Sequence, residues 1–151
     1  MATVKIEGLE DLRQILHNIA EKVPNNARGV MHRGADKIVE RAKLFTPRDT
    51  GALEDAIHQE SSYGYRGRLT IEIICGGGVN PKTGQPVDDY AAEIHESYND
   101  EHPGPGTVAK MNANPGVVIG DHFMTRALDE QAPKIEAAMI EATEVSRPTK
   151  W

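Results

Sequence analysis

Cysteine, aromatic side chains and long apolar runs are all scarce in this sequence of 151 residues. A single cysteine, Cys75, excludes an internal disulfide and is typical of a reducing compartment such as the cytoplasm. No apolar run approaches the roughly 20 residues that cross a bilayer, and the first residues lack the apolar stretch of a signal peptide. We therefore expect neither a membrane-bound nor a secreted protein.

Positive charge is missing from the middle of the sequence. Between Lys82 and Lys110 there is no lysine or arginine, whereas six acidic residues occur there, so this segment accounts for the whole net charge of −6. That sign argues against a protein that coats DNA or RNA, which needs a basic face. The six acidic residues are Asp88, Asp89, Glu93, Glu96, Asp100 and Glu101. We expect them to face a partner protein, or a lumen that repels DNA phosphates.

Helical spacing of apolar residues dominates the first 45 residues. One stripe runs from Leu9 to Val23 and a second from Ala27 to Phe45. Pro24 lies between them and is expected to end or kink the first helix, since proline lacks a backbone N–H. Asn25 or Asn26 is then expected to cap the second helix. The sequence thus predicts two N-terminal helices.

Strand signals follow these helices. The segment 53–62, the tyrosine- and glycine-rich turn 63–67 and the alternating stretch 69–75 predict an antiparallel hairpin. Alternation predicts a third strand over 90–94, and a short fourth one is expected over 117–119. We therefore expect a small, mainly antiparallel sheet of about four strands, and Thr3 to Ile6 is a separate short β-prone start.

Glycine and proline punctuate the rest of the chain. Thirteen of these residues lie in the loop-rich middle, 76–120, and 97–116 is expected to be one long loop. A last helix is expected after a cap at Asp121, bent or split at Pro133. The expected fold class is α+β, with the sheet packed by two N-terminal helices and a C-terminal helix. We expect one domain over 1–143 and a tail over 144–151.

Metal or enzyme chemistry has only weak support. His95 and Glu96 are followed by His102, but the zinc-protease pattern needs two histidines four apart on one helical face, and here they are seven apart. His122 could join them in space. We expect solvated loop histidines, no cofactor and no catalytic residues. The alternative is a small bacterial metal-dependent enzyme or ligand-binding domain that uses His95, Glu96 and His102 together with Cys75.

A third possibility is a DNA binder of the toxin or repressor type, using the basic side chains of the second predicted helix. These are interspersed with Asp36 and Glu40, which favours pairing along the helix rather than contact with phosphate. The basic side chains are Arg28, Arg33, Lys37, Arg41 and Lys43.

A compact turn motif, Thr-Pro-Arg-Asp-Thr-Gly-Ala-Leu, follows the second predicted helix at 46–53. Pro47 is expected to stop the helix, and Asp49 and Thr50 to bond backbone N–H groups in a tight turn. Gly51 permits a positive φ, and Leu53 is expected to anchor the next segment in the core. These features predict a structural turn rather than a contact site.

This motif, with others in the same order, resembles the neck proteins of tailed bacteriophages, also described as tail-completion, head–tail joining or putative minor tail components. The other motifs are the opening VKIEGLEDLRQIL, the segment Tyr90-Ala91-Ala92-Glu93-Ile94-His95-Glu96, and the helix start Phe123-Met124-Thr125-Arg126-Ala127-Leu128. The likeness spans roughly 3–143. It departs from the family pattern at Glu96-Ser97, where a glycine is usual, at Arg126, where a proline is usual, and in the long loop 97–116.

The resemblance implies a virion structural protein, not an enzyme. Such a protein assembles in the host cytoplasm as a homo-oligomeric, hexameric ring at the neck or tail top, and joins or completes the tail. Its implied partners are the adjoining head-closure or connector, tail-terminator or tail-tube proteins. DNA passes through the lumen without specific binding. The Gly/Pro-rich loops are expected to reach neighbouring subunits.

Overall fold

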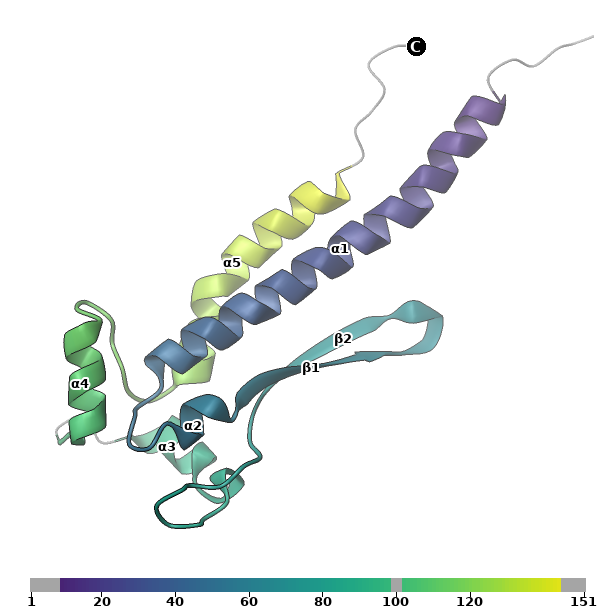
Figure 1. Cartoon of the computed structure of the whole chain (residues 1–151). Helices are drawn as coiled ribbons and strands as arrows, with labels where there is room; N and C mark the ends of the chain where they lie inside the picture. Colours follow the sequence, from purple (N-terminus) through teal and green to yellow (C-terminus); the bar gives the residue numbers. More distant parts are fainter. Residues whose placement is uncertain (1–8, 99–101, 145–151) are drawn as a thin grey trace, which may run out of the picture.

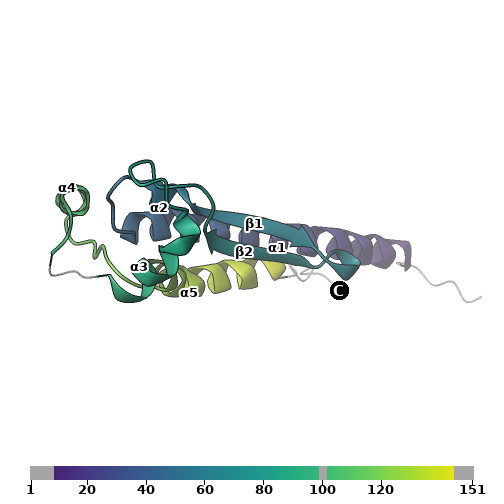
Figure 2. The same ribbon diagram turned by 90° about the horizontal axis from the view of Figure 1, so that it is seen from below.

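A computed structural model describes residues 9–98 and 102–144. The longest element is helix α1 (Leu9–Phe45), and a second helix, α5 (Phe123–Thr143), lies along it (Figure 1). The base of a β-hairpin lies near the C-terminal end of α1, and the short helices gather around that end (Figures 1 and 2). The mixed α+β class predicted from the sequence is confirmed.

The expected break at Pro24 does not occur, because α1 continues through it. Pro24 is exposed, so the carbonyl that loses its helical hydrogen bond lies where water can replace it. Neither asparagine caps a helix; Asn25 instead accepts a hydrogen bond from Arg28 at 3.2 Å. Ending the helix here would expose further unpaired N–H and C=O groups on both sides. One exposed proline is therefore tolerated.

Helix α5 also differs from its prediction in two respects. Pro133 lies within it without dividing it, and its N-cap residue is His122 rather than Asp121. The two long helices approach closely at Gly34 of α1, where an added Cβ would lie 2.8 Å from side-chain atoms of Ile135. A glycine at this position therefore lets α5 pack against α1.

The predicted hairpin is confirmed, but its first segment, expected from residue 53, is wrong at its start, because residues 53–55 are helical and the strand begins at Ile57. After the short helix α2 (Ala52–Asp55), strand β1 (Ile57–Tyr63) pairs antiparallel with β2 (Leu69–Cys75), with Ile57 opposite Cys75 and Tyr63 opposite Leu69. The turn contains a 3₁₀ segment, η1 (Tyr65–Gly67). Figure 2 shows the hairpin lying over α1, and in β2 the half-buried Leu69, Ile71 and Ile73 alternate with exposed residues.

The two further strands expected from alternation are wrong. Residues 91–94 instead lie in helix α3 (Ala91–Ser97), and Tyr90 connects this helix to a preceding 3₁₀ turn, η2 (Val87–Asp89). Tyr90 and Ile94 are four apart, a spacing that suits one helical face as well as a strand face, and both pack against the core. Residues 117–119 form no strand. Within the described ranges the sheet has two strands rather than about four. The expected strand 3–6 lies outside the described residues.

The expected loop 97–116 contains a helix, α4 (Pro105–Ala113). Proline at the first turn of a helix is favourable, since its fixed φ suits the helix and its missing N–H would have no partner there. The same Pro and Gly residues that predicted a loop thus begin α4.

The core lies where α1, α2, α3, α5 and the base of the hairpin meet, and its fully buried members include Ala42, Ile57, Phe123 and Ala127. No helix in the described ranges is both long and apolar enough to cross a membrane.

Candidate assembly surfaces and polar sites

The Thr46–Leu53 turn largely has the predicted structure. Pro47 and Leu53 are buried, and Gly51 has a φ of +90°. The Thr50 hydroxyl accepts a hydrogen bond from the Ala52 amide at 3.3 Å. Asp49 differs from its prediction, because its carboxylate accepts a hydrogen bond from the Lys82 ammonium, 2.6 Å away, rather than from a backbone N–H. The turn therefore shapes the chain through proline and glycine, and its exposed aspartate reaches another loop.

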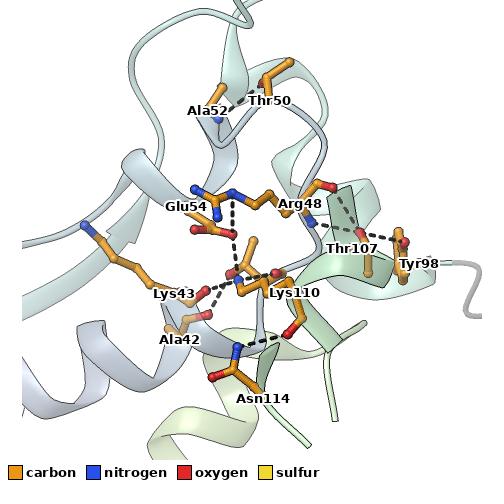
Figure 3. A network of polar contacts seen from close by, with 11 residues as sticks. Ala42, Lys43, Arg48, Thr50, Ala52, Glu54, Tyr98, Thr107, Lys110 and Asn114 are labelled. Carbon is orange, nitrogen blue, oxygen red and sulfur yellow. Dashed lines mark hydrogen bonds and ion pairs between the residues drawn. The ribbon is translucent and has the colours of Figure 1, made fainter. Parts of the chain in front are cut away.

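Helix α4 is held against this turn by a buried lysine, Lys110, shown in Figure 3. Its ammonium donates to the carbonyl oxygens of Lys43 at 2.5 Å and Thr46 at 2.7 Å, and to the Glu54 carboxylate at 2.6 Å. Three donors thus meet three acceptors. Burial lowers the pKa of Lys110, and the hydrogen bond to Glu54 opposes that change.

Two more α4 residues contact the turn. The buried Thr107 hydroxyl accepts from the Arg48 amide at 2.9 Å and donates to the Arg48 carbonyl at 3.1 Å. Tyr98 also reaches this hydroxyl, at 3.3 Å (Figure 3). At Gly106 an added Cβ would lie 2.5 Å from the Arg48 carbonyl oxygen, so only glycine fits there. This contact was not expected from the sequence, because nothing local to α4 identifies its acceptors.

The acidic residues Asp88, Asp89, Glu93 and Glu96 are exposed on η2 and α3. Asp88 has a structural contact as well, since its carboxylate accepts a hydrogen bond from the Gly77 amide at 3.0 Å. Asp100 and Glu101 lie outside the described residues. The facing surface expected for this group stays a prediction.

The predicted basic stripe on α1 is partly used within the molecule. Arg41 donates two hydrogen bonds to Glu130 of α5, at 3.0 and 2.7 Å, and this contact lowers the pKa of Glu130. Arg28 donates to the carbonyl of Gly67 in the hairpin turn at 3.2 Å. Lys37 pairs with Glu40 at 2.7 Å, as intrahelical pairing predicts. These contacts join α1 to α5 and to the hairpin.

An apolar groove of about 780 Å³ runs between α1, β2 and α5. Two of its α5 side chains, Leu128 and Ile140, are 49% and 57% exposed. An open depression lined mostly by apolar side chains is a candidate contact surface for another protein. The side chains lining it include Met31, Ile38, Ile71, Ile73, Leu128 and Ile140.

The first half of α1 is a second uncovered apolar surface. From Glu10 to Gly29 no residue is buried, and burial along the helix begins at Val30. The first turns project beyond both α5 and the hairpin in Figures 1 and 2. They carry the α1 N-terminal stripe, Leu12, Ile15 and Leu16, which are 44%, 39% and 58% exposed. Leu12 lies three and four residues before Ile15 and Leu16, so the three side chains share one helical face.

The histidines that lie together are not the set named in the metal-enzyme alternative. His95 and Glu96 lie beside His122, with the candidate ligand atoms within 4.8 Å of one another. Neither His102 nor Cys75 belongs to this group. Cys75 is half-buried, and burial, followed by the charge of Asp88, raises its pKa to about 11, which suits a structural thiol.

Comparison with known proteins adds no relative: no family model, curated protein or solved structure matches this chain.

Proposed function

We propose that this protein is a structural component of a tailed-bacteriophage virion, placed at the neck or tail top. It forms a hexameric ring that joins or completes the tail and lets DNA pass. The order of the sequence motifs suggests the family. The observation that carries the assembly role is the uncovered apolar surface: the groove between α1, β2 and α5, and the α1 N-terminal stripe.

The two surfaces suit each other. The stripe is convex, on a projecting helix, whereas the groove is concave and apolar. Since they are different patches of one chain, a stripe seated in a neighbour's groove is a head-to-tail contact, which closes into a ring when the rotation allows. An amphipathic helix lying in an apolar groove is a common recognition mode.

Burial of the exposed apolar side chains at such an interface would favour association of the subunits. Complete burial of a leucine side chain contributes about 1.5–3 kcal/mol, and Leu12 and Leu16 each keep about half of their surface exposed. Covering that surface therefore gives about 1 kcal/mol per leucine, and the groove side chains add a similar amount each. A ring repeats this contact at every interface, so modest single contacts suffice for a closed assembly.

The charge distribution supports passage of DNA without capture. The surface of η2 and α3 carries exposed carboxylates, and the sequence has no basic residue between Lys82 and Lys110 to offset them. A lumen lined with like charge repels phosphate. In this proposal the remaining loop surface meets the adjoining connector, tail-terminator or tail-tube ring.

Assembly is tested by analytical ultracentrifugation and electron microscopy of the purified chain and three variants. Leu16→Glu charges the stripe and Ile140→Glu charges the groove, and both are expected to reduce ring formation while leaving the circular dichroism spectrum unchanged. Tyr65→Glu is the matched control, since Tyr65 is 83% exposed at the hairpin turn, away from both surfaces. A wild-type chain that stays monomeric with the same profile as the variants contradicts the proposal.

The acidic surface is tested separately in assembled particles. Asp89→Asn with Glu93→Gln removes two exposed charges without touching Asp88, which supports the Gly77 amide. We expect particles that form less well or release DNA poorly, with the monomer still folded. Normal particle yield and infectivity would show that these charges have no part in assembly or DNA passage.

A further inference from the structure

The strongest unassigned site is the histidine cluster, defined by His95, Glu96 and His122. His95 and Glu96 are adjacent near the end of α3, and His122 immediately precedes α5. Their backbones are joined directly, because the His122 amide donates to the His95 carbonyl at 2.6 Å. Two segments 25 residues apart in sequence, with α4 between them, thus present three side chains to one place.

The donor atoms already lie near metal-binding spacing. His95 Nδ1 is 2.8 Å from Glu96 Oε1, and His122 Nδ1 is 4.0 Å from Glu96 Oε2. Ligands about 2.0–2.1 Å from a tetrahedral Zn²⁺ lie roughly 3.3 Å from one another. The observed separations lie on both sides of that value. The Glu96 carboxylate therefore lies between two imidazoles, and small side-chain rotations place all three on one ion.

The outer ring nitrogens also face oxygen partners. His95 Nε2 lies 3.5 Å from the Thr125 hydroxyl, and His122 Nε2 lies 3.9 Å from the Asp121 carboxylate. Histidines that bind metals commonly donate their other N–H to such an oxygen, which fixes the ring orientation. The Thr125 hydroxyl is at the limit of a hydrogen bond to His95, whereas the Asp121 carboxylate is too far from His122 for a hydrogen bond and contributes only its charge.

The backbone and packing hold the two rings in place. His122 has a φ of +48° and is one of two non-glycine residues with positive φ in the described ranges. Such conformations cost energy and concentrate at functional sites. The His95 ring packs edge-on against the fully buried Phe123, 4.9 Å between ring centres. The His95 side chain is 17% exposed, whereas the His122 and Glu96 side chains are 48% and 67% exposed.

We propose that His95, Glu96 and His122 bind one divalent transition-metal ion, Zn²⁺ in the first instance, with water as the fourth ligand. Two imidazoles and one carboxylate form a donor set that Zn²⁺ accepts. The ion cross-links the end of α3 to the start of α5 and closes the segment that carries α4. This site shares no residue with the groove or the α1 N-terminal stripe, so it can be tested apart from ring formation, whereas Glu96 also belongs to the acidic surface of α3.

Isothermal titration of tag-free protein with Zn²⁺, and Co²⁺ absorption as a spectroscopic readout, test the site. We expect one ion per chain, with visible Co²⁺ bands of high intensity that indicate tetrahedral coordination. His122→Asn removes the ligand, and asparagine tolerates the positive φ. Glu96→Gln removes the carboxylate and keeps the side-chain shape. Each variant should weaken binding at least tenfold.

The matched control is His102→Asn, because His102 is the histidine that the sequence alone would have chosen. It should leave both the affinity and the Co²⁺ spectrum unchanged. The proposal is overturned if wild-type protein binds no stoichiometric ion, or if His122→Asn and Glu96→Gln bind as tightly as wild type. Loss of binding in His102→Asn alone would overturn it too. Circular dichroism of each variant separates a lost ligand from a lost fold.

Discussion

Replacing Lys110 with methionine is the most informative perturbation of the fold. Methionine keeps most of the apolar stem but removes three donors, and so leaves the Glu54 carboxylate and the Lys43 and Thr46 carbonyls without their ammonium partner. Removing one partner of a buried ion pair costs about 3–5 kcal/mol. Glu54 keeps only Arg48 Nε, at 3.7 Å, which softens the loss, so we expect about 3 kcal/mol.

The loss should be local before it is global. Helix α4 has nine residues, too few for a stable isolated helix in water. Thr107 and Lys110 hold it to the rest of the fold through side-chain hydrogen bonds. We expect α4 to open while α1 and α5 stay folded. Amide hydrogen exchange resolved by residue should therefore accelerate over 105–113 by about 100-fold, which corresponds to about 3 kcal/mol.

Lys82→Met provides the matched control. Lys82 and Asp49 are also 2.6 Å apart, but their side chains are 62% and 67% exposed. An exposed pair contributes about 0–1 kcal/mol, so the same substitution should change little in urea unfolding or in exchange over 105–113. If Lys110→Met and Lys82→Met behave alike in both assays, the reasoning from burial is refuted. A second variant, Glu54→Gln in the Lys110→Met background, should add less than its cost alone, since the two side chains interact.

Three further outcomes are expected. Gly34→Ala should destabilise the protein by about 1–3 kcal/mol in urea unfolding, because the new Cβ would lie 2.8 Å from side-chain atoms of Ile135 in α5. Gly29→Ala, the control on the same helix, should be neutral or stabilising. Equal effects of the two substitutions would exclude the close contact at Gly34. Alkylation of Cys75 by iodoacetamide should rise with pH to a midpoint of about 11, and a midpoint near the ordinary 9.0 would contradict burial of the thiol. Arg41 lowers the pKa of Glu130, so wild type should be more stable than Glu130→Gln above the unfolded-state pKa, near 4.5, and this advantage should disappear as the pH falls through the lowered pKa. The advantage should stay below about 1 kcal/mol, because the ion pair is partly exposed. A stability difference in urea unfolding that does not depend on pH would contradict this expectation.

Local patterns predicted the elements whose signals were unambiguous. The alternation of Leu69 to Cys75, bounded by glycines, has a period of two and no competing helical reading, and β2 has those bounds. Gly51 was expected to need a positive φ, and it has one. In both cases neighbouring residues alone determine the backbone conformation.

The failures arise where long-range contacts decide the structure. Residues 90–94 fit either period, and packing of Tyr90 and Ile94 against the core selects the helix. The glycines and prolines near Pro105 suggested a loop, but acceptors more than 50 residues earlier in the chain hold Lys110 and Thr107 in a helix. No local window contains that information. The role of His122 is similar, since only the fold brings it to His95 and Glu96.

The β-hairpin has a consequence of its own. In the described part of the chain its two strands pair only with each other, so both are edge strands with one row of backbone N–H and C=O groups open to a further strand. Glu60 and Glu72 lie directly opposite each other at its centre, and like charges there oppose stacking of identical hairpins face to face. A neighbouring chain that extends this sheet must therefore add in its plane, through main-chain hydrogen bonds. Such growth has a direction set by the backbone, and it tolerates wide changes in side chains.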